Sequence, residues 1–150
     1  MLADELIETA RSLAAPGEPT QAGLRRAIST AYYALFHAVA RDAADLLVGT
    51  ETARAWAHLY RALDHGFARH ACAQVPKLGF PDGLKRCAEV FSDLQTLRHS
   101  ADYDPRRVFE LHVATDAISS AERAIAFLRA APEPDRRAFA VQLLLRQRPA

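Results

Sequence analysis

The eight prolines of this sequence lie in a few short zones and leave long proline-free stretches between them. Because proline breaks a helix interior but suits a first helical turn, these zones mark helix boundaries. The zones contain Pro16 and Pro19, Pro76 and Pro81, Pro105, Pro132 and Pro134, and Pro149. The stretches between them are rich in alanine and carry apolar residues at helical spacing, which predicts an all-α fold.

Six helices are expected from this spacing, over residues 3–14, 20–47, 51–73, 83–101, 106–131 and 135–146. Thr20 caps the second helix, and Asp104 with Pro105 suits the start of the fifth. Long helices with short links predict one domain, residues 1–150, folded as an antiparallel up-and-down bundle of four to six helices. We expect the core at residues 20–131 and the helix at 135–146 at the periphery.

Composition narrows the classes of function. The chain has 19 basic and 18 acidic residues, so its net charge of +1 gives no bulk argument for binding nucleic acid or a membrane surface. It has no run of about 18 apolar residues, and we expect no membrane span. Its two cysteines, Cys72 and Cys87, form neither a disulfide framework nor a metal-type spacing. This pattern predicts a cytoplasmic protein without a metal or other cofactor.

Residues 31–37 read Ala-Tyr-Tyr-Ala-Leu-Phe-His and lie within the second expected helix. On that helix Tyr33 and His37 are i, i+4 neighbours. One interpretation is that the aromatic rings form a helix–helix seam. The other is that Tyr33 and His37 line a binding groove together with Arg26 and Ser29, which lie nearby on the same side. The residues alone leave both interpretations open.

A second cluster lies at residues 97–105, which read Leu-Arg-His-Ser-Ala-Asp-Tyr-Asp-Pro. Arg98 lies near a helix C-terminus, where the helix dipole favours a cation, and Asp102 and Asp104 can pair with it or cap the next helix. In this interpretation the cluster is structural. Alternatively, Arg98, His99 and Tyr103 converge with the two carboxylates at a phosphate-binding or acid–base site.

Basic residues recur at spacings of three and four along the third expected helix, which predicts one continuous basic stripe. The stripe consists of Arg54, His58, Arg61, His65 and Arg69. It is either a solvated helix face or a track for the phosphate backbone of RNA or for a partner protein. The histidine spacings do not match a metal site.

The two motifs together carry a resemblance to a known family. A segment Arg-Ala-x-Ser-x-Ala-Tyr-Tyr-Ala-x-Phe-His-Ala, followed about 60 residues later by Leu-Arg-x-x-Ala-Asp-Tyr-Asp-Pro, resembles a prokaryotic branch of the HEPN domain superfamily. The resemblance implies a helical bundle that forms a homodimer. It also implies a metal-independent ribonuclease toxin of a toxin–antitoxin pair, partnered by a small nucleotidyltransferase.

The catalytic signature of that family is Arg-x(4–6)-His, and this sequence departs from it. After Arg98 and four intervening residues comes Tyr103, whose ordinary pKa near 10 makes it a poorer base than histidine at neutral pH. A literal match at Arg107 and His112 is rejected, because a continuous helix would place the two about 140° apart. Asp102 and His37 are the other candidates for a base beside Arg98.

Two functions therefore follow from the resemblance. The first is a toxin that binds RNA, or cleaves it without metal, through Arg98 with Tyr103, Asp102 or His37. The alternative is a non-catalytic module that dimerises and binds a nucleotide or a nucleotidyltransferase.

Overall fold

The computed structural model describes residues 1–15 and 17–149, and within them the chain is helical without a strand. Its elements are α1 (Leu2–Leu13), α2 (Gln21–Leu47), α3 (Arg54–Arg61), α4 (His65–Gln74), the short 3-10 helix η1 (Val75–Lys77), α5 (Asp82–Tyr103), α6 (Leu111–Ala130) and α7 (Glu133–Leu144). The all-α prediction is confirmed. The described residues form seven α-helices rather than four to six.

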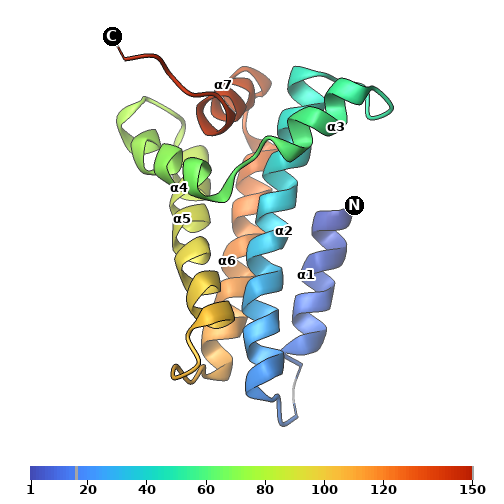
Figure 1. Ribbon diagram of the computed structural model, residues 1–150, viewed down its shortest axis with the longest axis vertical. Coiled ribbons are helices and arrows are strands. Elements are labelled where there is room, and N and C mark those ends of the chain that lie inside the picture. The colour runs from blue at the N-terminus through green and yellow to red at the C-terminus, as the bar shows by residue number, and fades with distance from the viewer. Residues whose placement is uncertain (16, 150) are drawn as a thin grey trace.

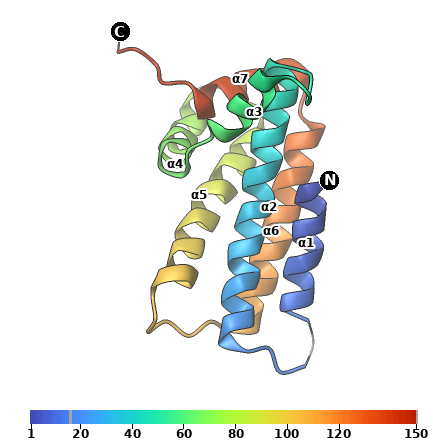
Figure 2. The same ribbon diagram turned by 45° about the vertical axis from the view of Figure 1, so that its right-hand side comes forward.

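Four helices form an up-and-down bundle, in which α1, α2, α5 and α6 run alternately in opposite directions (Figures 1 and 2). The shorter helices α3, α4 and α7 lie toward one end of this bundle (Figure 1). The core lies between α2, α5 and α6, where Leu35, Phe91 and Leu128 are at most 1% exposed. In the described residues, no helix is both long and apolar enough to cross a membrane.

The single helix expected over residues 51–73 is wrong, because the chain breaks there into α3 and α4. Leu63 is buried at the break, and the Asp64 carboxylate accepts a 2.8 Å hydrogen bond from the Phe67 backbone N–H. Asp64 is therefore the N-cap of a new helix inside an otherwise periodic run. The predicted basic stripe is also wrong as one continuous surface, since His65 begins a different helix from Arg61.

The boundary between α5 and α6 also differs from the expectation. Helix α5 continues to Tyr103, and α6 begins at Leu111 rather than at residue 106. Gln21 explains the delay, because its side-chain amide donates to the Phe109 carbonyl at 2.7 Å and accepts from the Phe109 N–H at 2.8 Å. Residues 104–110 are thus held against the start of α2 instead of being helical.

Helix α7 is part of the core, so its expected peripheral position is wrong. Phe139 and Leu143 are 1% and 0% exposed. Arg136 forms a 2.8 Å ion pair with Asp42 of α2, which ties α7 to the central helix. The amphipathic pattern at the C-terminal end therefore belongs to a helix that closes the upper end of the bundle.

Candidate functional site

Arg98 of α5 occupies an unusual environment for an arginine. The residue is 8% exposed, and its guanidinium carbon lies 5.3 Å from the ring centroid of Tyr32 and 5.8 Å from that of Tyr33. The nearest carboxylate oxygen belongs to Asp102, 3.5 Å from Nη1. Nε is buried without a partner, although a guanidinium offers five N–H donors. Arg98 therefore keeps unused capacity to bind an anion.

The two motifs meet at this arginine. Asp102 lies one turn beyond Arg98 on α5, and its side chain is 24% exposed. The Ser29 hydroxyl of α2 donates a long hydrogen bond of 3.3 Å to the same Asp102 oxygen. Helix α2 packs against α5, so Ser29, Tyr33, Arg98 and Asp102 form one cluster, which we call the Arg98 site.

His65 is the histidine that adjoins the Arg98 site. Its Nδ1 shares a 2.7 Å hydrogen bond with the Tyr32 hydroxyl, and its ring stacks on Phe36 at a centroid distance of 4.3 Å. Burial, and then the charge of Arg98, lower the pKa of His65. The sequence placed His65 only on the basic stripe. The signal that could have shown its position is Asp64, which begins a helix at that point.

His37 does not reach Arg98. Its Nδ1 shares a 2.6 Å hydrogen bond with the Tyr60 hydroxyl of α3, and burial lowers its pKa. The Tyr33 ring contacts both residues, with the His37 ring 6.3 Å away between centroids and the Arg98 guanidinium 5.8 Å away. Among the interactions of the described residues, none joins His37 directly to Arg98. The geometry therefore does not support His37 as the replacement for the histidine that is missing after Arg98.

Tyr103 and His99 form a separate pair on the surface. Tyr103 is 66% exposed, and its ring lies 4.9 Å from the exposed His99 ring between centroids. The geometric reason for rejecting Arg107 with His112 is wrong, because Arg107 precedes α6 and shares no helix with His112. The two residues nevertheless have separate partners, since Arg107 donates to Ser100 at 3.1 Å and His112 lies 3.2 Å from Glu110.

The other predicted binding residues lie in two places. Arg26 is exposed on α2 and lines a cavity of about 360 Å³ together with Ser29, Tyr33 and His37. Arg54, His58 and Arg61 are exposed on α3, toward the upper end of the bundle. Of the binding and catalytic residues expected from the sequence, Ser29, Tyr33 and Asp102 thus lie beside Arg98. The basic residues of α3 are not part of this cluster.

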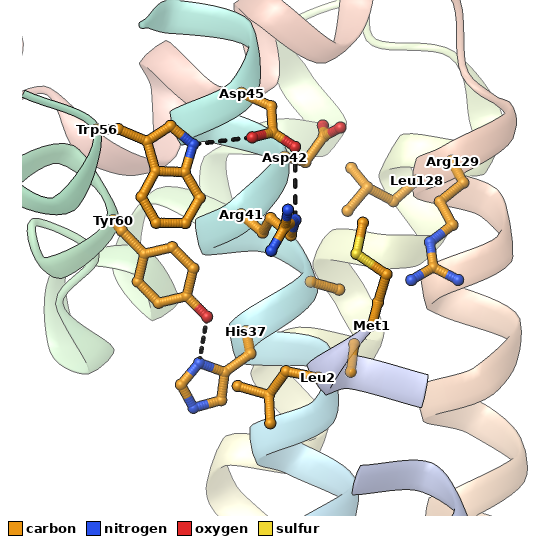
Figure 3. Close-up of a pocket in the computed structure, with 12 residues that line it drawn as sticks. Met1, Leu2, His37, Arg41, Asp42, Asp45, Trp56, Tyr60, Leu128 and Arg129 are labelled. Carbon is orange, nitrogen blue, oxygen red and sulfur yellow. Dashed lines mark hydrogen bonds and ion pairs between the residues drawn. The ribbon is translucent and has the colours of Figure 1, made fainter. Parts of the chain in front are cut away.

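A second cavity was missed by the sequence analysis. It measures about 460 Å³ and lies between α2, α3, α6 and the start of α1 (Figure 3). Trp56 and Tyr60 form one side, and the hydroxyl of Tyr60 points to His37 (Figure 3). Trp56 and Tyr60 are i, i+4 neighbours on α3, and their half-buried rings line this cavity.

In residues 1–15 and 17–149, no group of three or more histidine, cysteine, aspartate or glutamate side chains could hold a metal ion. Comparison with known proteins gave no match to a family model, a curated protein or a solved structure. The functional argument therefore depends on the chemistry of the Arg98 site.

Proposed function

We propose that this chain is a HEPN-like protein of a toxin–antitoxin system that binds RNA by holding a backbone phosphate at Arg98. The observation that carries the proposal is the buried guanidinium of Arg98, which lacks a hydrogen bond within the described residues and has one ion-pair contact at 3.5 Å. A guanidinium binds phosphate through two parallel N–H donors, which makes arginine well suited to this ligand.

The neighbours of Arg98 support this role. The rings of Tyr32 and Tyr33 restrict the guanidinium by cation–π contact. The Ser29 hydroxyl is bound to Asp102 only at 3.3 Å, so it can turn to donate to a phosphate oxygen instead. When the site is empty, Asp102 compensates the charge of Arg98. An arginine held in this way is prepared for an anion at little cost in side-chain order.

RNA cleavage without metal is the second candidate, and the position of Asp102 favours it. Asp102 is the carboxylate nearest to Arg98, at 3.5 Å. In this reaction Asp102 would take the proton of the ribose 2′-hydroxyl, whose oxygen attacks the adjacent phosphorus. The bond to the 5′-oxygen breaks, a proton passes to that oxygen, and a 2′,3′-cyclic phosphate remains. Arg98 would stabilise the charge on the phosphorane.

The remaining parts of the proposal come from the family resemblance. They are a homodimer and a nucleotidyltransferase partner, to which the cysteine pattern adds a cytoplasmic location. Both cysteines are free and buried, as suits a reducing compartment. A non-catalytic module that binds a nucleotide would hold its phosphate at the same arginine.

The test is fluorescence anisotropy with a labelled single-stranded RNA in the presence of EDTA, followed by electrophoresis of the same RNA. We expect Arg98→Ala to weaken binding at least tenfold, as charge-assisted hydrogen bonds to one phosphate are lost. Arg86→Ala is the matched control, because Arg86 lies on α5 and is exposed. Equal affinities of wild type and Arg98→Ala would refute the proposal. Intact RNA after long incubation would refute cleavage alone.

A further inference from the structure

Four half-buried rings extend from the Arg98 site along α2 to α3. Tyr33, which lies beside Arg98, is 6.3 Å from His37 between ring centroids. His37 is 5.7 Å from Tyr60, and Tyr60 is 5.1 Å from Trp56. We call Tyr33, His37, Tyr60 and Trp56 the aromatic ladder. Its members come from two helices, and the sequence alone does not place them in one row.

The aromatic ladder follows two adjoining cavities. The cavity of about 360 Å³ is lined by Ser29, Tyr33 and His37. The cavity of about 460 Å³ is lined by His37, Tyr60 and Trp56. His37 lines both, so the two cavities adjoin there, and Trp56 and Tyr60 lie on the wall of the larger one (Figure 3). Ser29 and Tyr33 of the Arg98 site line the smaller cavity, whereas Arg98 itself lines neither.

The cations around the larger cavity have carboxylate partners, although the Nε of Arg41 is buried without a hydrogen bond. Arg129 pairs with Asp4 at 2.9 Å, and Arg41 pairs with Glu51 at 2.8 Å. The indole N–H of Trp56 donates to Asp45 at 2.8 Å, which fixes its ring on the cavity wall (Figure 3). A cavity with paired charges and aromatic walls suits a flat, uncharged ring better than a phosphate.

We infer that the aromatic ladder is a base-binding track for single-stranded RNA. A backbone phosphate of the RNA lies at Arg98, and one base stacks in the cavity of about 460 Å³ beside Trp56, which we call the Trp56 cavity. The inference rests on the proposed function of Arg98. Proteins bind single strands by combining cationic contacts to the backbone with aromatic platforms for the bases, because every base has a flat face that can stack. The Arg98 site supplies the first element and the ladder the second.

The experiment compares two labelled strands of equal length, a single-stranded RNA and an abasic ribose-phosphate strand. The double variant Trp56→Leu/Tyr60→Leu should bind the RNA about tenfold more weakly, the loss expected for stacking at this position. Its affinity for the abasic strand should not change. Arg98→Ala should weaken the binding of both strands. Phe127→Leu is the matched control, since Phe127 is 41% exposed on α6 and lies outside the ladder.

Trp56 is the only tryptophan of the chain, so its fluorescence reports on the cavity in the unaltered protein. Saturating RNA should quench this fluorescence, and the abasic strand should not. Trp56→Phe keeps a ring at the position and should retain most of the affinity. This variant and the wild-type fluorescence decide the question even if the double leucine variant fails to fold.

Two results would overturn the inference and leave the proposed function intact. In the first, Trp56 fluorescence stays constant while Arg98→Ala abolishes RNA binding, which leaves the proposed function standing without the ladder. In the second, ladder variants lose a co-purifying protein but keep their RNA affinity, which makes the surface a protein interface. If Arg98→Ala and the ladder variants all bind like wild type, the proposed function fails together with the inference.

Discussion

At the scale of single residues, Arg98 is a buried cation with few of the hydrogen bonds that buried cations usually make. Burying a cation costs free energy that hydrogen bonds normally offset, yet Arg98 has two aromatic rings and one ion pair at 3.5 Å instead. Residues that cost stability in this way are concentrated at binding sites. Stability measurements therefore give evidence about Arg98 that is independent of any ligand.

We expect the free energy of unfolding of Arg98→Met to equal that of the wild type or to exceed it by about 1 kcal/mol. The reason is that methionine fills similar space without buried donors. The same variant should no longer bind RNA. Urea unfolding followed by circular dichroism measures the first effect and anisotropy the second. A loss of more than about 2 kcal/mol would show that the cation–π contacts and the Asp102 pair outweigh the burial cost.

His65 should make stability depend on pH. Burial and Arg98 lower its pKa in the folded protein, although Asp64 opposes this shift. The unfolded chain therefore binds the proton first, at a pKa of about 6.5, so the free energy of unfolding falls as pH drops below that value. The loss ends at the lower pKa of the folded state. His37 acts in the same direction, since burial lowers its pKa also.

We expect His65→Gln to reduce this pH dependence by at most one proton, measured by urea unfolding between pH 8 and pH 5. His112→Gln is the control, because the His112 side chain is 66% exposed on α6. A slope identical in His65→Gln and wild type would mean that folding does not depend on the charge of His65.

At the scale of elements, the break between α3 and α4 brings His65 to the Arg98 site. The Asp64 side chain holds the break by accepting the Phe67 N–H at 2.8 Å. We expect Asp64→Ala to lower the free energy of unfolding by about 0.5–2 kcal/mol, the range for a lost N-cap. Asp64→Asn keeps an acceptor of the same shape and should cost clearly less in the same urea titration. Equal losses in both variants would contradict the capping role.

Local signals predicted the elements that are stabilised locally. Thr20 accepts the Gly23 N–H at 3.0 Å, and α2 extends over Gln21–Leu47, close to the expected 20–47. The errors arose where distant residues decide the backbone. Gln21 fixes Phe109, 88 residues away, and so delays the start of α6. Helical periodicity carries no information about such a contact.

The candidate site was predictable to the same extent. Ser29 and Asp102 are 73 residues apart, and the sequence analysis assigned them to two separate clusters. His65 lies beside the Arg98 site, where His37 was expected. This difference depends on how α4 packs, and no spacing along the chain encodes that packing. The Trp56 cavity also needs three helices and the start of α1 in place before it exists.

At the scale of the whole molecule, α7 connects the cavity end of the bundle to the core. Its Arg136 pairs with Asp42 of α2, and its Phe139 ring lies 5.9 Å from that of Phe80 between centroids. Helix α2, which carries Tyr33 and His37 of the ladder, therefore packs against α1 and α6 as well as against α7. A packed helix of this kind should unfold together with the bundle rather than ahead of it.

Leucines on either side of the end of α7 give a matched test of that cooperativity. Leu143 is 0% exposed and Leu145 is 49% exposed. We expect Leu143→Ala to lower the free energy of unfolding by about 2–5 kcal/mol and Leu145→Ala by about 0.5 kcal/mol or less. Both variants should keep a single transition in urea, seen alike by circular dichroism and by Trp56 fluorescence. If Leu143→Ala costs no more than Leu145→Ala, α7 frays independently, and the cavity end lacks the support that we assign to it.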